Sequence, residues 1–398
     1  MKFELLNKNS NIAIIIAGII SIFIGVGIAR FSFTSLLPLM LNDFLTIKLV
    51  GFLASVNYIG YLIGSIVAIF IKDIYTRIQF FRLGLILSII STIILGITIN
   101  EVLWTISRII AGFSTAMVLV VCSSIVMSKL NIEDKTKMMG IYYSGIGFSI
   151  VVVDLIIKTI NINNNLWQFS WLILTIFATI FSIYPLYILS LDKKINNQNI
   201  KHKIEKHIFT PFVIILIIAY FCEGVGFVVQ ATFLPDIINK LEGLEGFGSL
   251  TWLFVGIAGI PASIIWMKLA YKFGSTNMII YALFIQIIGI LIPTITNNIY
   301  LNILSGALYG GTFIGLSALF MNLVGKLSGK NPVVLMGTIT TSYSIGMIVA
   351  PLYCVALYEK FHSHKYSLYL TALIVFLGLL LLIYAKKKQI VREQYLKH

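Results

Sequence analysis

Long apolar stretches, separated by short polar segments, fill almost the whole chain. They lie at residues 12–38, 48–71, 80–99, 103–127, 138–160, 168–190, 209–238, 249–270, 276–296, 299–325, 333–358 and 367–385. A helix needs about 20 apolar residues to cross the hydrocarbon core of a bilayer, and each stretch is long enough to span it. The pattern therefore predicts an all-α integral membrane protein with twelve transmembrane helices. The first stretch lacks a small-residue cleavage site, so we expect it to be retained as the first helix.

Composition leaves no room for a soluble domain. Of the 398 residues, 59% are hydrophobic and only 11% are charged, and the mean hydropathy is +0.97. Ordinary soluble chains carry about a quarter charged residues. Any binding chemistry must then lie between helices, with the lipid bilayer around them.

The basic residues indicate how the helices are oriented. The net charge is +14, and with both termini inside, 22 Lys and Arg fall on the inner side and five on the outer side. Such an asymmetry over short loops is the positive-inside pattern. It predicts a multi-pass protein of the plasma (inner) membrane with both termini cytoplasmic. Because no basic stripe with interleaved aromatic residues occurs on a soluble element, we do not expect nucleic-acid binding.

The longest polar stretch, Asp192 to His207, lies almost at the midpoint and leaves six apolar stretches on each side. It predicts an N-terminal six-helix half at 1–190, a cytoplasmic linker at 191–208 and a C-terminal half at 209–398 with a short tail. The segments 25–40 and 224–237 both begin Gly-Val-Gly and continue to Leu-Pro, which suggests two pseudo-symmetric halves. Parallel six-helix repeats are typical of one large transporter architecture.

Two motifs resemble those of the major facilitator superfamily. Arg108-Ile-Ile-Ala-Gly112 is similar to its Arg-x-x-x-Gly signature of the fourth span. Residues 269–274, Leu-Ala-Tyr-Lys-Phe-Gly, are similar to its Leu-Ala-Asp-Arg-Phe-Gly loop, with Tyr271 at the position of the acid. The resemblance implies a gating role for Lys272 and Gly274. The first-half counterpart of this loop, at residues 72–77, lacks the glycine.

The chain resembles one branch of that superfamily, the YbfB-like proteins, more closely. The segments that carry this resemblance are 27–38, 53–64, 143–147 and 223–235, and together they extend it over essentially the whole chain. The resemblance implies the major facilitator fold and secondary transport. It also implies that helices 1, 4, 7 and 10 line a central cavity.

Four charged residues within the apolar stretches, Arg30, Arg108, Asp154 and Glu223, stand out as candidates, because a charge there is costly unless it faces a cavity or a partner. The implied fold would place Arg30, Arg108 and Glu223 around one space. We interpret the arginines as anchors for an anionic group and Glu223 as the proton-coupling carboxylate, the alternative being a structural ion pair that locks helices together. Asp154 stands four residues before Lys158, and this spacing predicts a pair on one helix face that reaches outward to the interface.

Uncharged polar residues and glycines complete the candidate site. The predicted cavity-lining donors are Asn57, Tyr58, Tyr61, Tyr142, Tyr143, Gln230 and Tyr309, although such residues also pack in helix interfaces. Glycines spaced for close helix approach include Gly60, Gly64, Gly140, Gly145 and Gly147. They are interpreted either as static packing or as positions that let the two halves rock during alternating access.

The chain contains no phosphate-binding loop for ATP, so transport must draw on a gradient. We predict a secondary active transporter of a small organic solute, anionic or zwitterionic, coupled to protons or another ion and working as a monomer without a cofactor. An efflux pump for amphipathic compounds and a non-transporting receptor or sensor remain alternatives. An enzyme is not expected, because no His lies within the apolar stretches and no His-Glu-x-x-His motif occurs. The three cysteines are widely spaced within apolar stretches, which argues against a zinc site.

Overall fold

A computed structural model describes residues 6–71, 73–130, 135–161, 167–190, 209–327 and 332–395. These residues contain twelve helices that are long and apolar enough to cross a membrane. The first six spans are α2 (Asn11–Ile22) with η1 (Phe23–Phe31) and α3 (Ser32–Leu41), α4 (Ile47–Phe70), α5 (Ile74–Ile97), α6 (Glu101–Ala116) with η2 (Met117–Val121) and α7 (Cys122–Lys129), α8 (Lys135–Ile160) and α9 (Trp167–Ile188). The last six are α10 (Pro211–Asn239), α11 (Gly248–Phe273), α12 (Ser275–Ile295), α13 (Ile299–Leu327), α14 (Pro332–Phe361) and α15 (Lys365–Tyr395).

The predicted all-α membrane fold is confirmed, and two of the helix boundaries that differ from the apolar pattern have a local explanation. α5 begins at Ile74, six residues before the predicted start, because the Asp73 side chain caps it by accepting a hydrogen bond from the amide of Thr76 at 2.7 Å. α15 continues to Tyr395, well past the last apolar residue, since a helix can leave the bilayer once it has crossed it. The predicted linker at 191–208 lies outside the described residues.

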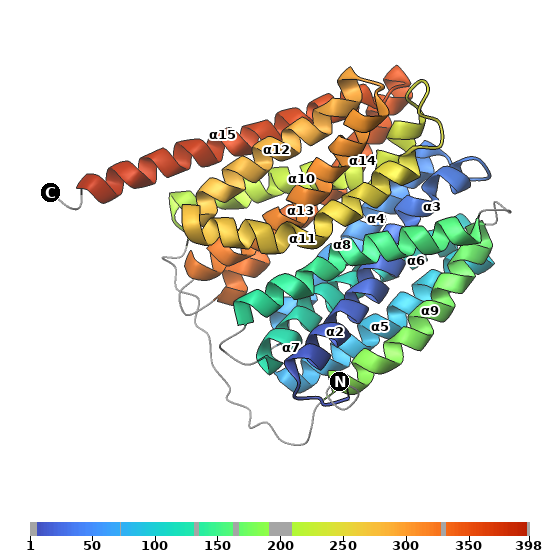
Figure 1. Cartoon of the computed structure of the whole chain (residues 1–398), viewed down its shortest axis with the longest axis horizontal. Coiled ribbons are helices and arrows are strands. Elements are labelled where there is room, and N and C mark those ends of the chain that lie inside the picture. Colours follow the sequence, from blue (N-terminus) through green and yellow to red (C-terminus); the bar gives the residue numbers. More distant parts are fainter. Residues whose placement is uncertain are drawn as a thin grey trace.

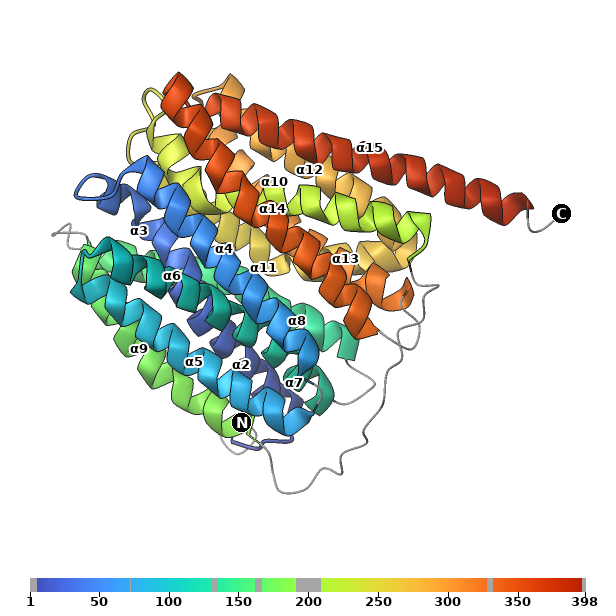
Figure 2. The same cartoon turned by 180° about the vertical axis from the view of Figure 1, so that it is seen from behind.

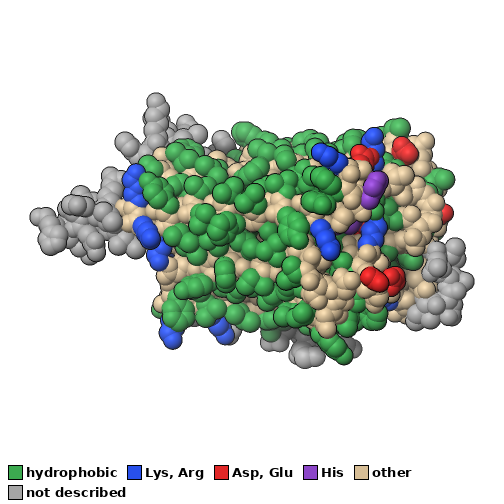
Figure 3. Space-filling model, turned by 90° about the horizontal axis from the view of Figure 1, so that it is seen from above, with side chains coloured by type: hydrophobic (Ala, Val, Ile, Leu, Met, Phe, Trp, Pro, Cys, Tyr) green, Lys and Arg blue, Asp and Glu red, His purple; other side chains and the backbone are tan. Residues whose placement is uncertain are grey.

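The first six spans gather on one side of the molecule and the last six on the other (Figure 1). Two pairs of helices join the sets along their length: α8 packs on α11, and α4 packs on α14 (Figure 2). α3 also contacts α10. On the face shown in Figure 3, hydrophobic side chains cover the middle of the molecule, while the charged side chains gather at its two ends. That band is the surface expected to face lipid.

Two interhelical turns repeat the same hydrogen bonds in the two sets of spans. Between α5 and α6, Thr98 accepts a bond from the amide of Asn100, and Asn100 caps α6. Between α12 and α13, Thr296 and Asn298 make the equivalent bonds. Corresponding residues are 198 positions apart (98 and 296, 100 and 298). The repeat predicted from the Gly-Val-Gly segments thus has a counterpart in local structure.

The same 198-residue offset recurs in the packing of the helices. The Ser107 hydroxyl donates to the Ser91 carbonyl at 2.7 Å, and the Ser305 hydroxyl donates to the Gly289 carbonyl at 2.6 Å. Further along the same helices, Gly112 and Gly310 lie against backbone of a neighbouring helix, at residues 57 and 255 respectively. Both helix pairs therefore approach closely at equivalent points.

Two short π-helical segments interrupt the first and fourth spans. η1 and η2 pack together, and a Cβ atom on Gly25 would lie only 2.6 Å from Val118 Cβ. The Thr115 hydroxyl donates to the Gly25 carbonyl at 2.7 Å, which gives that oxygen a partner across the interface. Single-turn π segments occur frequently at functional sites. Here η1 carries Arg30.

Candidate functional site

Arg30 lies in η1, buried at the junction between the two sets of spans. Its guanidinium carbon is 4.9 Å from the ring centroid of Tyr58 and 5.7 Å from that of Tyr61, both on α4. From the other set, Phe227 on α10 lies at 5.0 Å, and the Met347 sulfur on α14 is 3.5 Å from Nη2. The guanidinium of Arg30 thus lies against ring faces and a sulfur atom.

Arg108 on α6 is the neighbour of Arg30. Its Nη1 donates to the carbonyl of Ala29 at 3.2 Å, and its guanidinium carbon lies 4.4 Å from the ring centroid of Phe33. The two guanidinium groups are close enough to repel each other electrostatically. Among the described residues, the Nε atoms of both arginines lack a hydrogen-bond partner.

Glu223 on α10 is completely buried, and within the described residues neither of its carboxylate oxygens has a hydrogen-bond partner. Gln286 on α12 lies beside it, close enough for an electrostatic interaction but without a hydrogen bond of ordinary geometry. Tyr220, one turn before Glu223 on α10, also interacts with the carboxylate. The carboxyl group therefore lies among aromatic rings and one side-chain amide.

Tyr309 on α13 and Tyr343 on α14 lie close enough to interact electrostatically with both Arg30 and Glu223. Over the described ranges, the ion pairs are those of Asp154 with Lys158 and of Asp236 with Lys240 and His364. Within the described residues, neither arginine is paired with a carboxylate, so the ion pair that would lock the helices together does not form there in this conformation. That Arg30, Arg108 and Glu223 surround one space stays a prediction.

Close approach of α10 and α14 brings the aromatic residues together. Cβ atoms on Gly224 or Gly346 would collide with backbone of the facing helix, so glycine is required at both positions. This approach stacks Tyr343 on Tyr220, with centroids 4.5 Å apart and planes 23° apart. Tyr220, Phe227, Tyr343 and Met347 were not predicted as site residues. The spacing of residues 220, 223 and 227 on one helix face was a usable signal, whereas nothing in the sequence connects α14 to that face.

The predicted polar residues divide into two groups. Tyr58, Tyr61, Tyr143 and Tyr309 lie near the centre: Tyr143 interacts with Tyr61, and the Tyr309 hydroxyl donates to the Phe227 carbonyl at 2.7 Å. Asn57, Tyr142 and Gln230 instead make contacts with neighbouring helices.

Asn57 Nδ2 donates to the backbone carbonyl of Arg108 at 2.8 Å, which fixes α4 against α6 behind the guanidinium. The Tyr142 ring packs under Gly18 and beside Cys122, within the first six spans. Gln230 Nε2 is 3.4 Å from the carbonyl of Gly289 on α12. These contacts hold neighbouring helices together.

The candidate gating glycines also differ in what they touch. Cβ atoms on Gly60 and Gly64 would meet α6, and one on Gly145 would meet Ile19, all within the first six spans. Gly140 and Gly147 instead face α11, across the junction between the two sets. Only this second group lies where one set would move against the other.

In the loop between α11 and α12, Gly274 has a φ of 87°, a conformation that favours glycine and turns the chain directly into α12. Lys272 just before it is exposed, with its ammonium 5.2 Å from the ring centroid of Phe273. The first-half counterpart is described in part, because residue 72 lies outside the described residues.

The predicted pair of Asp154 and Lys158 forms, with 2.9 Å between Nζ and Oδ2. Its expected outward reach is wrong for the carboxylate, which is 1% exposed, because α11 covers it. Asp154 Oδ1 accepts from the hydroxyl of Ser249, and Lys158 donates to the Ser249 carbonyl at 3.3 Å. The pair therefore connects α8 to the first turn of α11 across the junction.

Another contact across the junction joins α3 and α10 at the predicted outer end. Pro235 has no amide hydrogen, so the carbonyl four residues earlier, on Ala231, loses its helical partner. The Thr34 hydroxyl on α3 donates to that carbonyl at 2.5 Å. The hydrogen bond closes the first span against the seventh.

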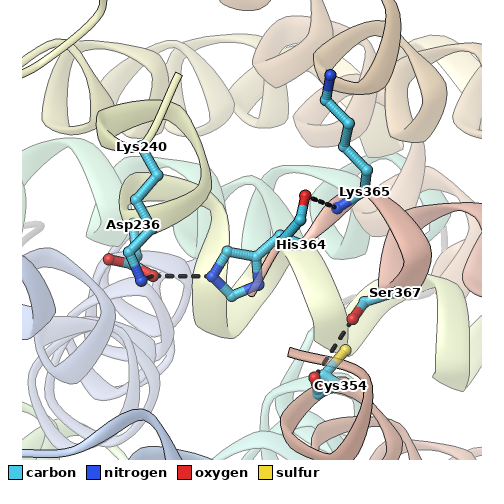
Figure 4. Close-up of polar contacts among 7 residues, drawn as sticks. Asp236, Lys240, Cys354, His364, Lys365 and Ser367 are labelled. Carbon is cyan, nitrogen blue, oxygen red and sulfur yellow. Dashed lines mark hydrogen bonds and ion pairs between the residues drawn. The ribbon is translucent and has the colours of Figure 1, made fainter. Parts of the chain in front are cut away.

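Figure 4 shows a buried polar cluster where α10 ends and α15 begins. The Asp236 carboxylate is 2.8 Å from Lys240 Nζ and 2.9 Å from His364 Nε2. Burial lowers the pKa of His364 below its ordinary value, although the hydrogen bond and charge of Asp236 oppose this. The cluster connects the start of α15 to the end of α10. It shares no charged residue with the central site.

Comparisons with known proteins agree with this architecture. A family model described as "Uncharacterised MFS-type transporter YbfB" matches residues 22–383. Among solved structures, that of a mutant of the nucleoside transporter NupG has a TM-score of 0.70, covering 94% of this chain and 99% of that chain. The identity is 12%, so this likeness concerns the fold. A search of the curated proteins found no match.

Proposed function

Since the chain belongs to the major facilitator superfamily, in the family of the uncharacterised YbfB-type transporters, we propose that it carries a small organic anion by alternating access, coupled to protons. Arg30 and Arg108 bind the anionic group of the substrate, and Glu223 binds and releases the proton. The positive-inside distribution of 22 against five basic residues supports insertion in the cytoplasmic membrane with both termini cytoplasmic. The site is contained within one chain, which fits a monomer.

The observation that carries the proposal is the pair of buried arginines without a carboxylate partner among the described residues. Charges within a membrane span cost several kcal/mol unless a partner or water compensates them. Cation–π contacts and one backbone carbonyl compensate only part of that cost. A substrate carboxylate would supply the missing negative charge, and a guanidinium binds it through two parallel hydrogen bonds.

Proton coupling rests on the position of Glu223 relative to Arg30. The arginine belongs to the first six spans and the carboxyl group to the last six, so movement of one set against the other changes their separation. A nearby positive charge favours the ionised carboxylate, and its absence in a buried site favours the protonated form. Each transport cycle can then take up and release one proton as the site opens to the two sides.

A binding experiment with simple ions tests the anion site. Acetate, benzoate and phosphate are each titrated into the purified protein while its thermal unfolding is followed, with benzyl alcohol as a neutral compound. We expect at least one anion to stabilise the protein, and Arg30→Lys and Arg108→Lys to weaken that effect about tenfold or more in concentration, because lysine lacks the planar fork. Arg82→Lys, in the third turn of α5, is the matched control and should bind as the wild type does. Unchanged anion affinity in both site variants would refute the role of the arginines.

A further inference from the structure

The surroundings of Arg30 point to the organic part of the substrate. On the premise of the anion site proposed above, we propose that the preferred substrates are small aromatic carboxylates, whose flat ring stacks against the aromatic side chains that adjoin Arg30.

Arg30 is the point where the anion site meets the aromatic residues. Tyr58 and Phe227 approach it from opposite sets of spans, with centroids 4.9 and 5.0 Å from the guanidinium carbon. A carboxylate bound to this guanidinium would leave the rest of its molecule next to these rings. In benzoate, a single bond joins the ring to the carboxylate. A benzoate whose carboxylate binds Arg30 would therefore have its ring beside Tyr58 and Phe227.

The rings beyond Arg30 present parallel faces rather than edges. Tyr309 and Phe313 are 5.0 Å apart with 21° between their planes, and Tyr309 and Phe227 are 6.4 Å apart with 24° between them. Tyr220 and Tyr343 continue the series at 4.5 Å and 23°. We call these five residues, from α10, α13 and α14, the aromatic wall. These rings are in contact with one another, so a substrate ring would stack on a face of the aromatic wall as the two sets of spans separate. A flat aromatic ring makes that contact over its whole face, whereas a puckered saturated ring touches it through fewer atoms.

The composition of this region favours a ring over a flexible chain. Aromatic side chains have few rotatable bonds and hold a fixed surface, and in the aromatic wall the Tyr309 hydroxyl is further fixed by its bond to the Phe227 carbonyl. Flexible aliphatic cargo is suited to adaptable surfaces rich in methionine and leucine. Met347, whose sulfur is 3.5 Å from Arg30 Nη2, is of that kind, whereas Tyr58, Tyr61 and Phe227 offer ring faces to the guanidinium.

Three carboxylates and one neutral compound test the inference on the full-length purified protein. Benzoate, cyclohexanecarboxylate and hexanoate share the anionic group but differ in the flatness and flexibility of the rest, and benzyl alcohol keeps the ring without the charge. Dissociation constants are measured by calorimetry or from the stabilisation of the protein. We expect benzoate to bind about 2- to 12-fold more tightly than cyclohexanecarboxylate, the range expected for one aromatic stacking contact. Hexanoate and benzyl alcohol should bind more weakly than benzoate.

A pair of variants assigns the preference to the aromatic wall. Phe227→Leu should weaken the binding of benzoate more than that of cyclohexanecarboxylate, so that the ratio between their affinities falls toward one. Phe148→Leu, which removes a lipid-facing ring 45% exposed on α8, should leave the ratio unchanged. If Phe227→Leu does not fold, the wild-type series alone decides.

The outcomes separate this inference from the proposal on which it rests. Equal binding of benzoate and cyclohexanecarboxylate would overturn the aromatic preference and leave anion transport standing. Binding of benzyl alcohol as tightly as benzoate would overturn the anion site itself, and binding of none of the carboxylates would overturn both.

Discussion

Replacing Gly147 with alanine tests whether the α8–α11 contact is the interface that moves during transport. A Cβ atom there would lie 2.6 Å from the carbonyl carbon of Gly259 and 2.7 Å from the oxygen of Gly256, with the amide nitrogen of Ile260 closer still. Ordinary van der Waals contact begins at 3.4 Å, so the two helices must separate by about 1 Å. These atoms are backbone, which makes a local side-chain adjustment insufficient.

The neighbouring glycine provides a matched control. A Cβ atom on Gly145 would lie 3.2 Å from Cγ1 of Ile19, a flexible side chain within the first six spans. Both alanine variants gain the same helix propensity, about 1 kcal/mol, so the difference between them isolates the contact across the junction. Overpacking of this kind costs about 1–3 kcal/mol. We therefore expect Gly147→Ala to disfavour the present conformation by roughly 5- to 150-fold relative to Gly145→Ala.

Thermal unfolding in detergent and counterflow of a bound anion in proteoliposomes measure the two consequences. Gly147→Ala should unfold at a lower temperature and turn over more slowly than Gly145→Ala, which should resemble the wild type. The same unfolding temperature and the same turnover for both variants would refute the idea that this close contact controls the movement of the two sets of spans.

Two further predictions concern the predicted outer end. Thr34→Val leaves the Ala231 carbonyl without a donor, at a cost of about 1–3 kcal/mol, so hydrogen exchange of the α3 and α10 amides should accelerate, and unchanged exchange would contradict a closing role for this bond. Because the folded-state pKa of His364 is lowered, its stabilising effect should be complete above about pH 6.5, its ordinary value, and be lost as the pH falls toward the folded-state pKa. Thermal unfolding between pH 7.5 and 5 should show a steeper acid loss in the wild type than in His364→Gln. Asp236 and Lys240 are the charged residues that face this position, and they are the same in both proteins. Equal loss of stability with falling pH in the two proteins would therefore mean that a group other than His364 titrates.

The twelve spans were predictable because lipid imposes a length and an apolar composition that can be read directly from the chain. The charged residues of the site were predictable for the same reason, since Arg30 and Glu223 stand out in an apolar stretch. The residues that surround them were not. Tyr343 reaches Glu223 only because two helices distant in sequence approach each other at a pair of glycines. The π-helical segment that carries Arg30 likewise packs against η2, which comes from a span distant in the sequence.

The role of Glu223 in coupling is tested most directly by comparing exchange with accumulation in proteoliposomes that contain Glu223→Gln. Exchange of an anion across the membrane needs no net proton movement, whereas accumulation driven by a pH gradient does. Asp73→Asn at the start of α5 is the control for loss of an acid outside the site, and it should behave as the wild type in both assays.

We predict that Glu223→Gln exchanges the anion at a rate near that of the wild type and no longer accumulates it when a pH gradient is imposed. A correctly folded Glu223→Gln protein that still accumulates the anion against its concentration gradient, driven by pH alone, would contradict proton coupling through this carboxyl group.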